Sequence, residues 1–336
     1  MARPVILCSG QWADVPFENL CEKVKSFGYE GIEIACAGDH LDLKKAATDP
    51  KYAEERKNIL KNHGFKVWVI ATQMIGQCVS DAEDPRLNVV APSALAGKPE
   101  EIRKWAIQEM KYAAAAAKNL GAKTVTGVIG SPLFTYWYGQ PQTTEQMIAD
   151  AYAQVLKHWN PIFDEFDKNG IKFAVEVKPG GIAFDYYSAD RFLKELKSRK
   201  NLGFCFNPSS LFWQGITPHL FIRDFQSRIF HVHMKDAAVT LDGRSGLLGS
   251  FLPFGDVKRA WNFRSLGHGD IDFESIIREL NAINYKNILS VDWEDQCMNR
   301  DVGAKEACDF MKNVNFSPSD SVSDEAQTEH RAAKAD

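Results

Sequence analysis

Short apolar runs alternate with stretches of helical periodicity along most of the chain. Apolar runs of this length are typical of buried parallel strands, whereas a period near 3.6 residues predicts an amphipathic helix. The predicted strands are Val5–Cys8, Gly31–Ala35, Phe65–Ala71, Ala122–Ile129, Phe173–Pro179, Phe204–Asn207, Phe230–Lys235 and Ile288–Trp293. The predicted helices are Phe17–Phe27, Leu43–Asn62, Pro99–Gly121, Thr143–Gly170, Ser188–Ser198, Pro218–Ser227, Asp272–Ile283 and Asp301–Asn313. Eight strands that each feed a helix predict a (β/α)8 TIM barrel, a single α/β domain over residues 1–315.

Three predicted connections are unusually long, Thr72–Lys98, Gly130–Pro141 and Asp236–Asp270. Long connections in a compact domain are uncommon unless they serve function. The connection Gly130–Pro141 is rich in aromatic residues. We expect Asp236–Asp270 to be a loop. After the last helix, residues 316–336 are rich in Ser, Ala and charge, so they have little apolar surface to bury, and we expect a disordered C-terminal tail.

Composition narrows the class of protein. The chain has 336 residues, of which 45% are hydrophobic and 25% charged, and a net charge of −4. This balance favours neither a nucleic-acid partner nor an anionic membrane, and no apolar run approaches the roughly 20 residues that span a bilayer. The seven cysteines form no C-x-x-C pair, which indicates a reduced protein and a cytoplasmic location.

Polar side chains stand at the ends of the last four predicted strands: Glu176, Asn207, His233 and Asp292. A barrel of parallel strands carries its chemistry at the carboxyl ends of the strands, so these side chains should converge on one divalent metal ion. Oxygen and imidazole ligands suit Mn²⁺, Mg²⁺, Co²⁺ or Zn²⁺. Other roles stay open: Glu176 could pair with a lysine, and Asn207 begins an Asn-Pro turn. Asp292 also competes with Glu294 for one ligand position.

Further polar positions are candidates for substrate contact. Glu33 lies inside the second strand, and His40 lies in the loop after it. His231 shares a strand face with His233 and could bind substrate or only orient its neighbour. Trp137 could stack on the apolar face of a sugar, although most tryptophans serve packing. His268 lies in the seventh loop, where a solvent-exposed residue is the alternative.

Several motifs resemble those of the sugar phosphate isomerase/epimerase-like family, in the xylose-isomerase-like TIM barrel superfamily. The resemblance covers nearly all of residues 3–315. It rests on Gly28–Ile34, Gly38–Asp42, Val175–Val177, Asn207–Gly215, His231–Asp236, Gly267–Asp270 and Ser290–Asp295. Family members hold a divalent ion with Glu, Asp, His and Glu, matching Glu176, Asn207, His233 and Asp292. Asn207 replaces an Asp and Asp292 a Glu, so the ligand charge falls from −3 to −2 and metal binding should be weaker.

The resemblance implies a divalent-metal-dependent isomerase or epimerase that acts on a keto-sugar by α-proton transfer through an enediolate. We expect Mn²⁺ as the ion, with Mg²⁺, Co²⁺ or Zn²⁺ as alternatives. The expected partners are a small carbohydrate substrate and further copies of the chain in a homo-oligomer, with a small partner subunit as a further alternative. One alternative function is a lyase or deglycosylase that eliminates the substituent of a 3-keto-glycoside after the same proton abstraction. The other is a non-catalytic barrel subunit with a degraded metal site.

The site residues expected under this reading fall into three groups. The catalytic candidates are Glu176, Asp292, His268 and Lys178. The substrate-binding candidates are Glu33, His40, His231, Trp137 and Glu294. The metal ligands are Glu176, Asn207, His233 and Asp292.

Overall fold

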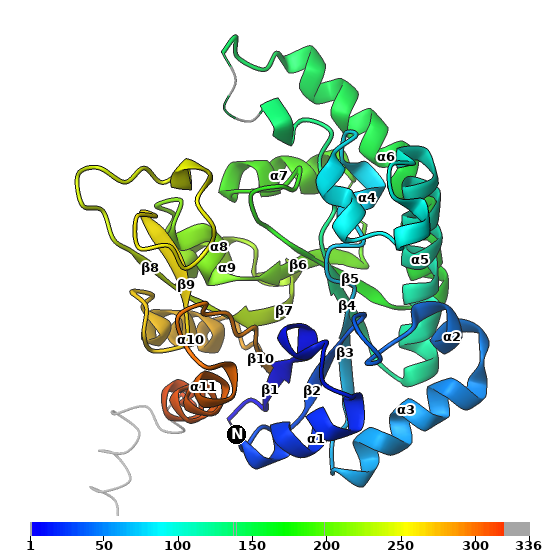
Figure 1. The fold of residues 1–336 in the computed structure, drawn as a ribbon, viewed down its shortest axis with the longest axis vertical. Coiled ribbons are helices and arrows are strands. Elements are labelled where there is room, and N and C mark those ends of the chain that lie inside the picture. The colour runs from blue at the N-terminus through cyan, green and yellow to red at the C-terminus, as the bar shows by residue number, and fades with distance from the viewer. Residues whose placement is uncertain (1, 137, 139, 198, 319–336) are drawn as a thin grey trace, which may run out of the picture.

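Eight parallel strands close into a barrel in the computed structural model, which describes residues 2–136, 138, 140–197 and 199–318 (Figure 1). The strands run in chain order around the barrel, and β1 closes it by pairing with β10, Val5 opposite Leu289. The single all-parallel sheet confirms the predicted (β/α)8 fold. The barrel strands are β1 Val5–Cys8, β2 Ile32–Ala35, β3 Val67–Ala71, β4 Thr124–Gly127, β5 Lys172–Glu176, β6 Leu202–Phe206, β7 Ile229–Met234 and β10 Leu289–Val291.

Helices surround the strands, and their bounds follow the predicted ones with one clear exception. The predicted helix 43–62 is two helices, because Pro50 has no N–H to continue the first and Asp49 caps the second by accepting from Lys51 N. Short α4 and α8 were not predicted. The helices are α1 Phe17–Ser26, α2 Leu43–Thr48, α3 Pro50–Asn62, α4 Gln77–Ser80, α5 Pro99–Leu120, α6 Glu145–Asn169, α7 Tyr186–Glu195, α8 Pro208–Phe212, α9 Pro218–Asp224, α10 Phe273–Ala282 and α11 Arg300–Val314.

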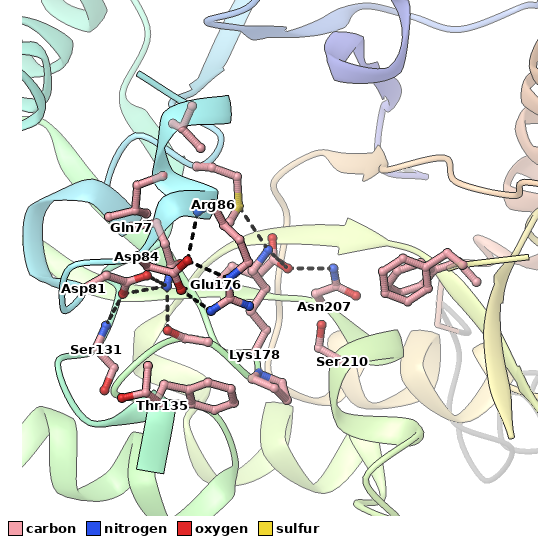
Figure 2. Close-up of a pocket in the computed structure, with 18 of the residues that line it drawn as sticks. Gln77, Asp81, Asp84, Arg86, Ser131, Thr135, Glu176, Lys178, Asn207 and Ser210 are labelled. Carbon is pink, nitrogen blue, oxygen red and sulfur yellow. Dashed lines mark hydrogen bonds and ion pairs between the residues drawn. The ribbon is translucent and has the colours of Figure 1, made fainter. Parts of the chain in front are cut away.

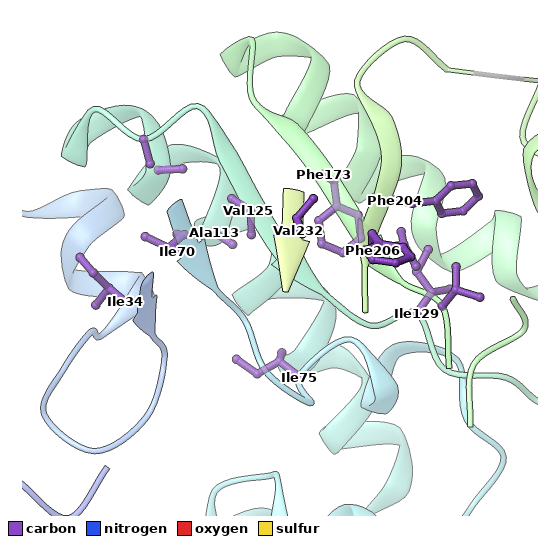
Figure 3. Close-up of a cluster of buried hydrophobic side chains, with 14 of the residues drawn as sticks. Ile34, Ile70, Ile75, Ala113, Val125, Ile129, Phe173, Phe204, Phe206 and Val232 are labelled. Atoms are coloured by element: carbon purple, nitrogen blue, oxygen red, sulfur yellow. The ribbon is translucent and has the colours of Figure 1, made fainter. Parts of the chain in front are cut away.

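Alternation along each strand separates an apolar outer face from a polar interior. Phe173 and Phe204 point outward into the main buried cluster, which the helices cover (Figure 3). Their neighbours Ala174 and Cys205 belong to a separate small cluster. Because successive side chains of a strand point to opposite faces, Glu176 and Asn207 continue the inward rows. The barrel thereby carries these two polar side chains to one mouth.

The predicted loop Asp236–Asp270 contains a two-stranded antiparallel ribbon, which corrects the sequence prediction. Strand β8, Asp236–Val239, pairs with β9, Trp261–Arg264. Four-residue strands around a long polar connection carry too little periodicity to stand out in a sequence. The carboxylate of Asp236 fastens the end of this segment by accepting from the backbone N–H groups of Gly267 and Gly269, 3.0 Å each. Because β8 follows directly after β7, the ribbon lies at the mouth of the barrel formed by the carboxyl ends of the strands.

Among the described residues, no helix has both the length and the hydropathy needed to cross a bilayer. The last described helix, α11, ends at Val314, and most of the predicted tail 316–336 lies outside the described residues. The boundary at residue 315 therefore stays a prediction.

Candidate active site

Three buried side chains from strands far apart in sequence meet inside the barrel. Glu33 of β2 is fully buried and accepts from His231 Nε2 at 2.8 Å and from His233 Nε2 at 3.1 Å. Its other contact is the Thr126 hydroxyl, which donates at 2.6 Å. Burial alone would raise the pKa of Glu33, but the two histidines lower it well below its usual range. Glu33 is thus an anion that orients both imidazole rings.

The orientation of His233 leaves its second ring nitrogen facing two carboxylates. Nδ1 lies 3.6 Å from Glu176 Oε2 and 4.0 Å from Asp292 Oδ2. It is buried and has no hydrogen-bond partner among the described residues. Burial acts to lower the pKa of His233, but Cys205, Glu33 and Glu176 outweigh it and raise the pKa well above its usual range, so without an ion the ring is protonated. Because Nε2–H is donated to Glu33, a metal ion that displaced the other proton would meet the lone pair of Nδ1 between the carboxylates. These three residues form a candidate metal-ligand cluster, and their mixed oxygen and nitrogen atoms fit a divalent ion.

Asn207 stands beside this cluster but turns its oxygen away. As N-cap of α8, it accepts with Oδ1 from Ser209 N at 3.1 Å and from Ser209 Oγ at 2.8 Å. Its amide nitrogen donates to Glu176 Oε1 at 3.2 Å, as Figure 2 shows. In this orientation Asn207 positions Glu176 and offers no lone pair to an ion, so three side chains are left as ligands.

Lys235 places a positive charge next to the same cluster. Its ammonium donates to Asp292 Oδ2 at 3.0 Å and to Glu294 Oε2 at 2.6 Å. Burial acts to lower the pKa of Lys235, but the two carboxylates outweigh it and raise the pKa. The side chain is only 9% exposed and lies over the ring of Phe263, 4.3 Å from its centroid. A metal ion would therefore share Asp292 with a resident cation.

A cavity of about 680 Å³ opens above these groups, and Glu176, Lys178, Asn207, Lys235 and Glu294 belong to its lining (Figure 2). Burial by itself raises the pKa of Glu176, but the nearby cations, foremost Lys178, lower it to about 2. Glu176 is thus a carboxylate at neutral pH. The cavity gives a small ligand access to it.

Two contrasting walls flank this cavity. On one side, the rings of Trp213 and Trp261 stack at 4.6 Å and 4°, and Phe254 and Phe263 also line the space. On the other side, Asp81 accepts from Ser131 N at 2.7 Å. Burial raises the pKa of Asp81 to about 6. The cavity thus offers an aromatic face and a polar face to a ligand.

The fold agrees with comparisons to known proteins. Residues 21–314 match the family described as xylose isomerase-like TIM barrel. The chain belongs to this family. At the level of sequence it is similar to the uncharacterized protein YfiH of Bacillus subtilis (strain 168), with 21% identity over 89% of this chain and 95% of that one.

Solved structures of similar fold include enzymes and a metal-bound protein. The apo form of 3-keto-D-glucoside 4-epimerase, YcjR, from E. coli superposes with a TM-score of 0.65 and 14% identity, covering 93% of this chain and 99% of that one. The IOLI protein with a bound zinc atom gives a TM-score of 0.62 and 18% identity, covering 94% of this chain and 100% of that one. At these identities the likeness shows the shared fold.

The structure brings together part of the predicted site. Glu176, His233, Asp292 and Glu294 lie around Lys235, and Lys178 Nζ lies 4.0 Å from Glu176 Oε1. These residues stay candidates for catalysis and binding.

Four other predicted site residues are not among those that line the cavity. Glu33 and His231 are buried beneath the site and bonded to each other. His40 is buried, with its ring nitrogens 3.0 Å from Ser9 Oγ and Val15 O. His268 is half exposed, pairs with Glu306 at 3.1 Å and is not among the residues that line the cavity. Trp137 falls outside the described residues.

Sequence reasoning missed three parts of the cavity: Lys235 as partner of Asp292, Asp81, and the aromatic ribbon. The signal for Lys235 was present, because His231, His233 and Lys235 alternate along one strand. Asp81 and the aromatic ribbon lie in long connections without a sequence period, so their positions in the cavity could not be predicted from the sequence.

Proposed function

We propose that the protein is a divalent-metal-dependent sugar isomerase or epimerase that moves the α-proton of a keto-sugar through an enediolate. The observation that carries this proposal is the buried Nδ1 of His233, which has no partner among the described residues and faces Glu176 and Asp292. Glu176, His233 and Asp292 would hold the ion, with Mn²⁺ preferred. A bound ion polarises a carbonyl and acidifies the neighbouring C–H. The epimerase and the zinc-bound protein that share the fold support this assignment.

The protein's own groups perform the proton transfer. Glu176 is an anion at neutral pH and lines the cavity, so it serves as the base that removes the α-proton. Asn207 holds Glu176 in place through its amide nitrogen. Glu176 keeps the proton that it removed, and Asp292, on the other side of His233, passes a proton from the Lys235 ammonium bonded to it to the enediolate carbon. Glu33 keeps His233 in the orientation that the site requires.

The aromatic wall favours a second candidate, a lyase or deglycosylase of 3-keto-glycosides. Removal of the proton at C2 of such a substrate gives an enediolate that can expel the group at C1. The stacked Trp213 and Trp261, with Phe254 and Phe263, offer an apolar surface for an aromatic aglycone. The proton abstraction is the same in both candidates, so Glu176 keeps its role.

One substrate separates the two candidates. The Mn²⁺-loaded protein is incubated in D₂O with p-nitrophenyl 3-keto-glucoside, and NMR and absorbance follow deuterium uptake beside the ketone and release of p-nitrophenol. Deuterium uptake with the aglycone retained supports the epimerase, and release supports the lyase. Glu176→Gln should lower either rate about 10²–10⁴-fold, because it removes the base and keeps the shape. Glu306→Gln, at a residue of α11 that does not line the cavity, is the matched control. Neither exchange nor release, or no bound Mn²⁺ by elemental analysis, would overturn the proposal and favour a non-catalytic subunit.

A further inference from the structure

A second cavity, of about 650 Å³, lies at the opposite end of the barrel from the candidate active site. Its lining includes residues at the beginnings of strands, Val67 of β3 and Thr124 of β4, and Pro4 just before β1. Its inner wall carries apolar and aromatic side chains, among them Trp68 and Phe230. Nothing in the proposed reaction uses this cavity.

Four lysines line this cavity, and its lining contains no Asp or Glu: Lys66, Lys123, Lys172 and Lys286. No carboxylate of the described residues lies within ion-pair distance of any of the four ammonium groups. Two of them instead face the aromatic wall, Lys66 5.7 Å from the ring centroid of Trp68 and Lys172 4.5 Å from that of Phe230. Four cations gathered without counter-charges, in a chain of net charge −4, indicate a place for an anion.

A repeated local sequence creates this arrangement. Each lysine follows a residue of positive φ that ends a helix and then one buried apolar residue. The four segments are Gly64-Phe65-Lys66, Gly121-Ala122-Lys123, Gly170-Ile171-Lys172 and Asn284-Tyr285-Lys286. The left-handed residue turns the chain, and the apolar residue anchors it in the core. The lysine therefore reaches the rim at the same level in four of the eight units.

Complementing helix dipoles would be another reason for lysines at these positions, because helix carboxyl ends carry partial negative charge. That explanation requires neither a cavity nor an aromatic wall. Trp68 lines the cavity with its ring, while its Nε1 is buried and has no partner among the described residues. His231, only 2% exposed, contributes a further polar side chain to the lining. These features point to a ligand with both charge and an apolar part.

We propose that this cavity binds a small organic anion carrying two or more negative charges, with its apolar part against Trp68 and Phe230. The four lysines neutralise the charges, and the aromatic rings give the site its preference for organic over inorganic anions. The proposal is independent of the reaction at the other end of the barrel.

The test is calorimetric titration of the full chain with ADP and with inorganic pyrophosphate, in chelator so that no metal binds either probe. ADP should bind more tightly than pyrophosphate. The double variant Lys123→Gln/Lys286→Gln should raise the Kd for ADP at least about tenfold, since a hydrogen bond to a charged group contributes about 1.5–3 kcal/mol. The matched control is Lys25→Gln/Lys61→Gln, which removes two exposed lysines of α1 and α3 that lie outside the cavity lining. Its Kd should stay within about twofold of the parent's.

Several results would overturn the proposal. An equal loss of ADP affinity in both double variants would mean diffuse electrostatic attraction. An absence of binding by either probe at millimolar concentration, with a lower melting temperature for Lys123→Gln/Lys286→Gln, would leave dipole complementation as the role of the lysines. ADP binding that survives in that variant but is lost in Lys178→Gln would place the anion in the candidate active site. Equal affinity for ADP and pyrophosphate would show that Trp68 and Phe230 do not contribute to binding.

Discussion

Asn207→Asp tests whether position 207 and Glu176 share one electrostatic site. The substitution keeps the oxygen that caps α8 and replaces the amide nitrogen, 3.2 Å from Glu176 Oε1, by a second anionic oxygen. Two unit charges at that separation repel by about 5 kcal/mol at an effective dielectric constant of about 20. Proton uptake and side-chain movement relieve part of this repulsion. We therefore expect the free energy of unfolding without metal to fall by about 2 kcal/mol, a drop of roughly 4 °C in melting temperature.

A divalent ion should reverse this loss, because both carboxylates then face a cation. If binding recovers even about 1.4 kcal/mol of the repulsion, the affinity for Mn²⁺ rises tenfold. Thermal unfolding in chelator and equilibrium dialysis with Mn²⁺ measure the two effects. Asn58→Asp, which adds the same charge on the exposed surface of α3, is the control and should show neither. A variant as stable as the parent in chelator, with unchanged Mn²⁺ affinity, would refute the proposed common site.

Three further predictions concern the walls of the site. Lys235→Met should destabilise the protein by about 3–5 kcal/mol, because it leaves the partly buried carboxylates of Asp292 and Glu294 without their cation. Lys178 is more exposed and lies 4.0 Å from Glu176, so Lys178→Met should cost much less. Equal losses of unfolding free energy in denaturant titrations would contradict this difference. The pKa of Asp81, raised to about 6 in the fold, means that its contribution to stability is present below about pH 4 and is lost as the pH rises through 6. Asp81→Asn should flatten the melting temperature between pH 4 and 7, and an unchanged slope would show that another group titrates. Trp213→Ala should raise KM for p-nitrophenyl 3-keto-glucoside about 3- to 10-fold, because it removes one of the stacked rings. KM for the methyl 3-keto-glucoside should stay unchanged, since the methyl group does not reach those rings. An equal rise in KM for both substrates would exclude an aglycone contact.

The alternation of apolar runs and amphipathic stretches determined the fold class. Parallel strands with a period of two and connecting helices have one common closed arrangement, so the barrel and the mouth that carries Glu176, His233 and Asp292 followed from the sequence. Alternation along the seventh strand also puts Lys235 on the same face as His233, although its pairing with Asp292 did not follow from that pattern. These inferences are local, because they depend only on neighbours along one strand.

The partner of each polar group was decided by the tertiary structure. Glu33 meets His233 across 200 positions of sequence and is thereby a buried support, where its strand position had suggested a substrate contact. His40 is likewise buried, and His268 is held on the outside by Glu306. A polar residue in a pattern does not reveal whether its hydrogen bonds are already satisfied, since that depends on segments brought together only when the barrel closes.

Barrel closure also decides which segments surround the cavity at each end of the barrel. The segments Gly121-Ala122-Lys123 and Gly170-Ile171-Lys172 are visible in the sequence, but each is an ordinary helix end followed by a charged rim residue. Closure of the sheet places them around one cavity. At the other end, the ribbon β8–β9 carries Trp261 to Trp213 through a connection with no readable period. The sequence by itself determined which strands end in polar side chains, and the closed barrel decided which of those side chains face a ligand, because burial and charge pairing are properties of the whole fold.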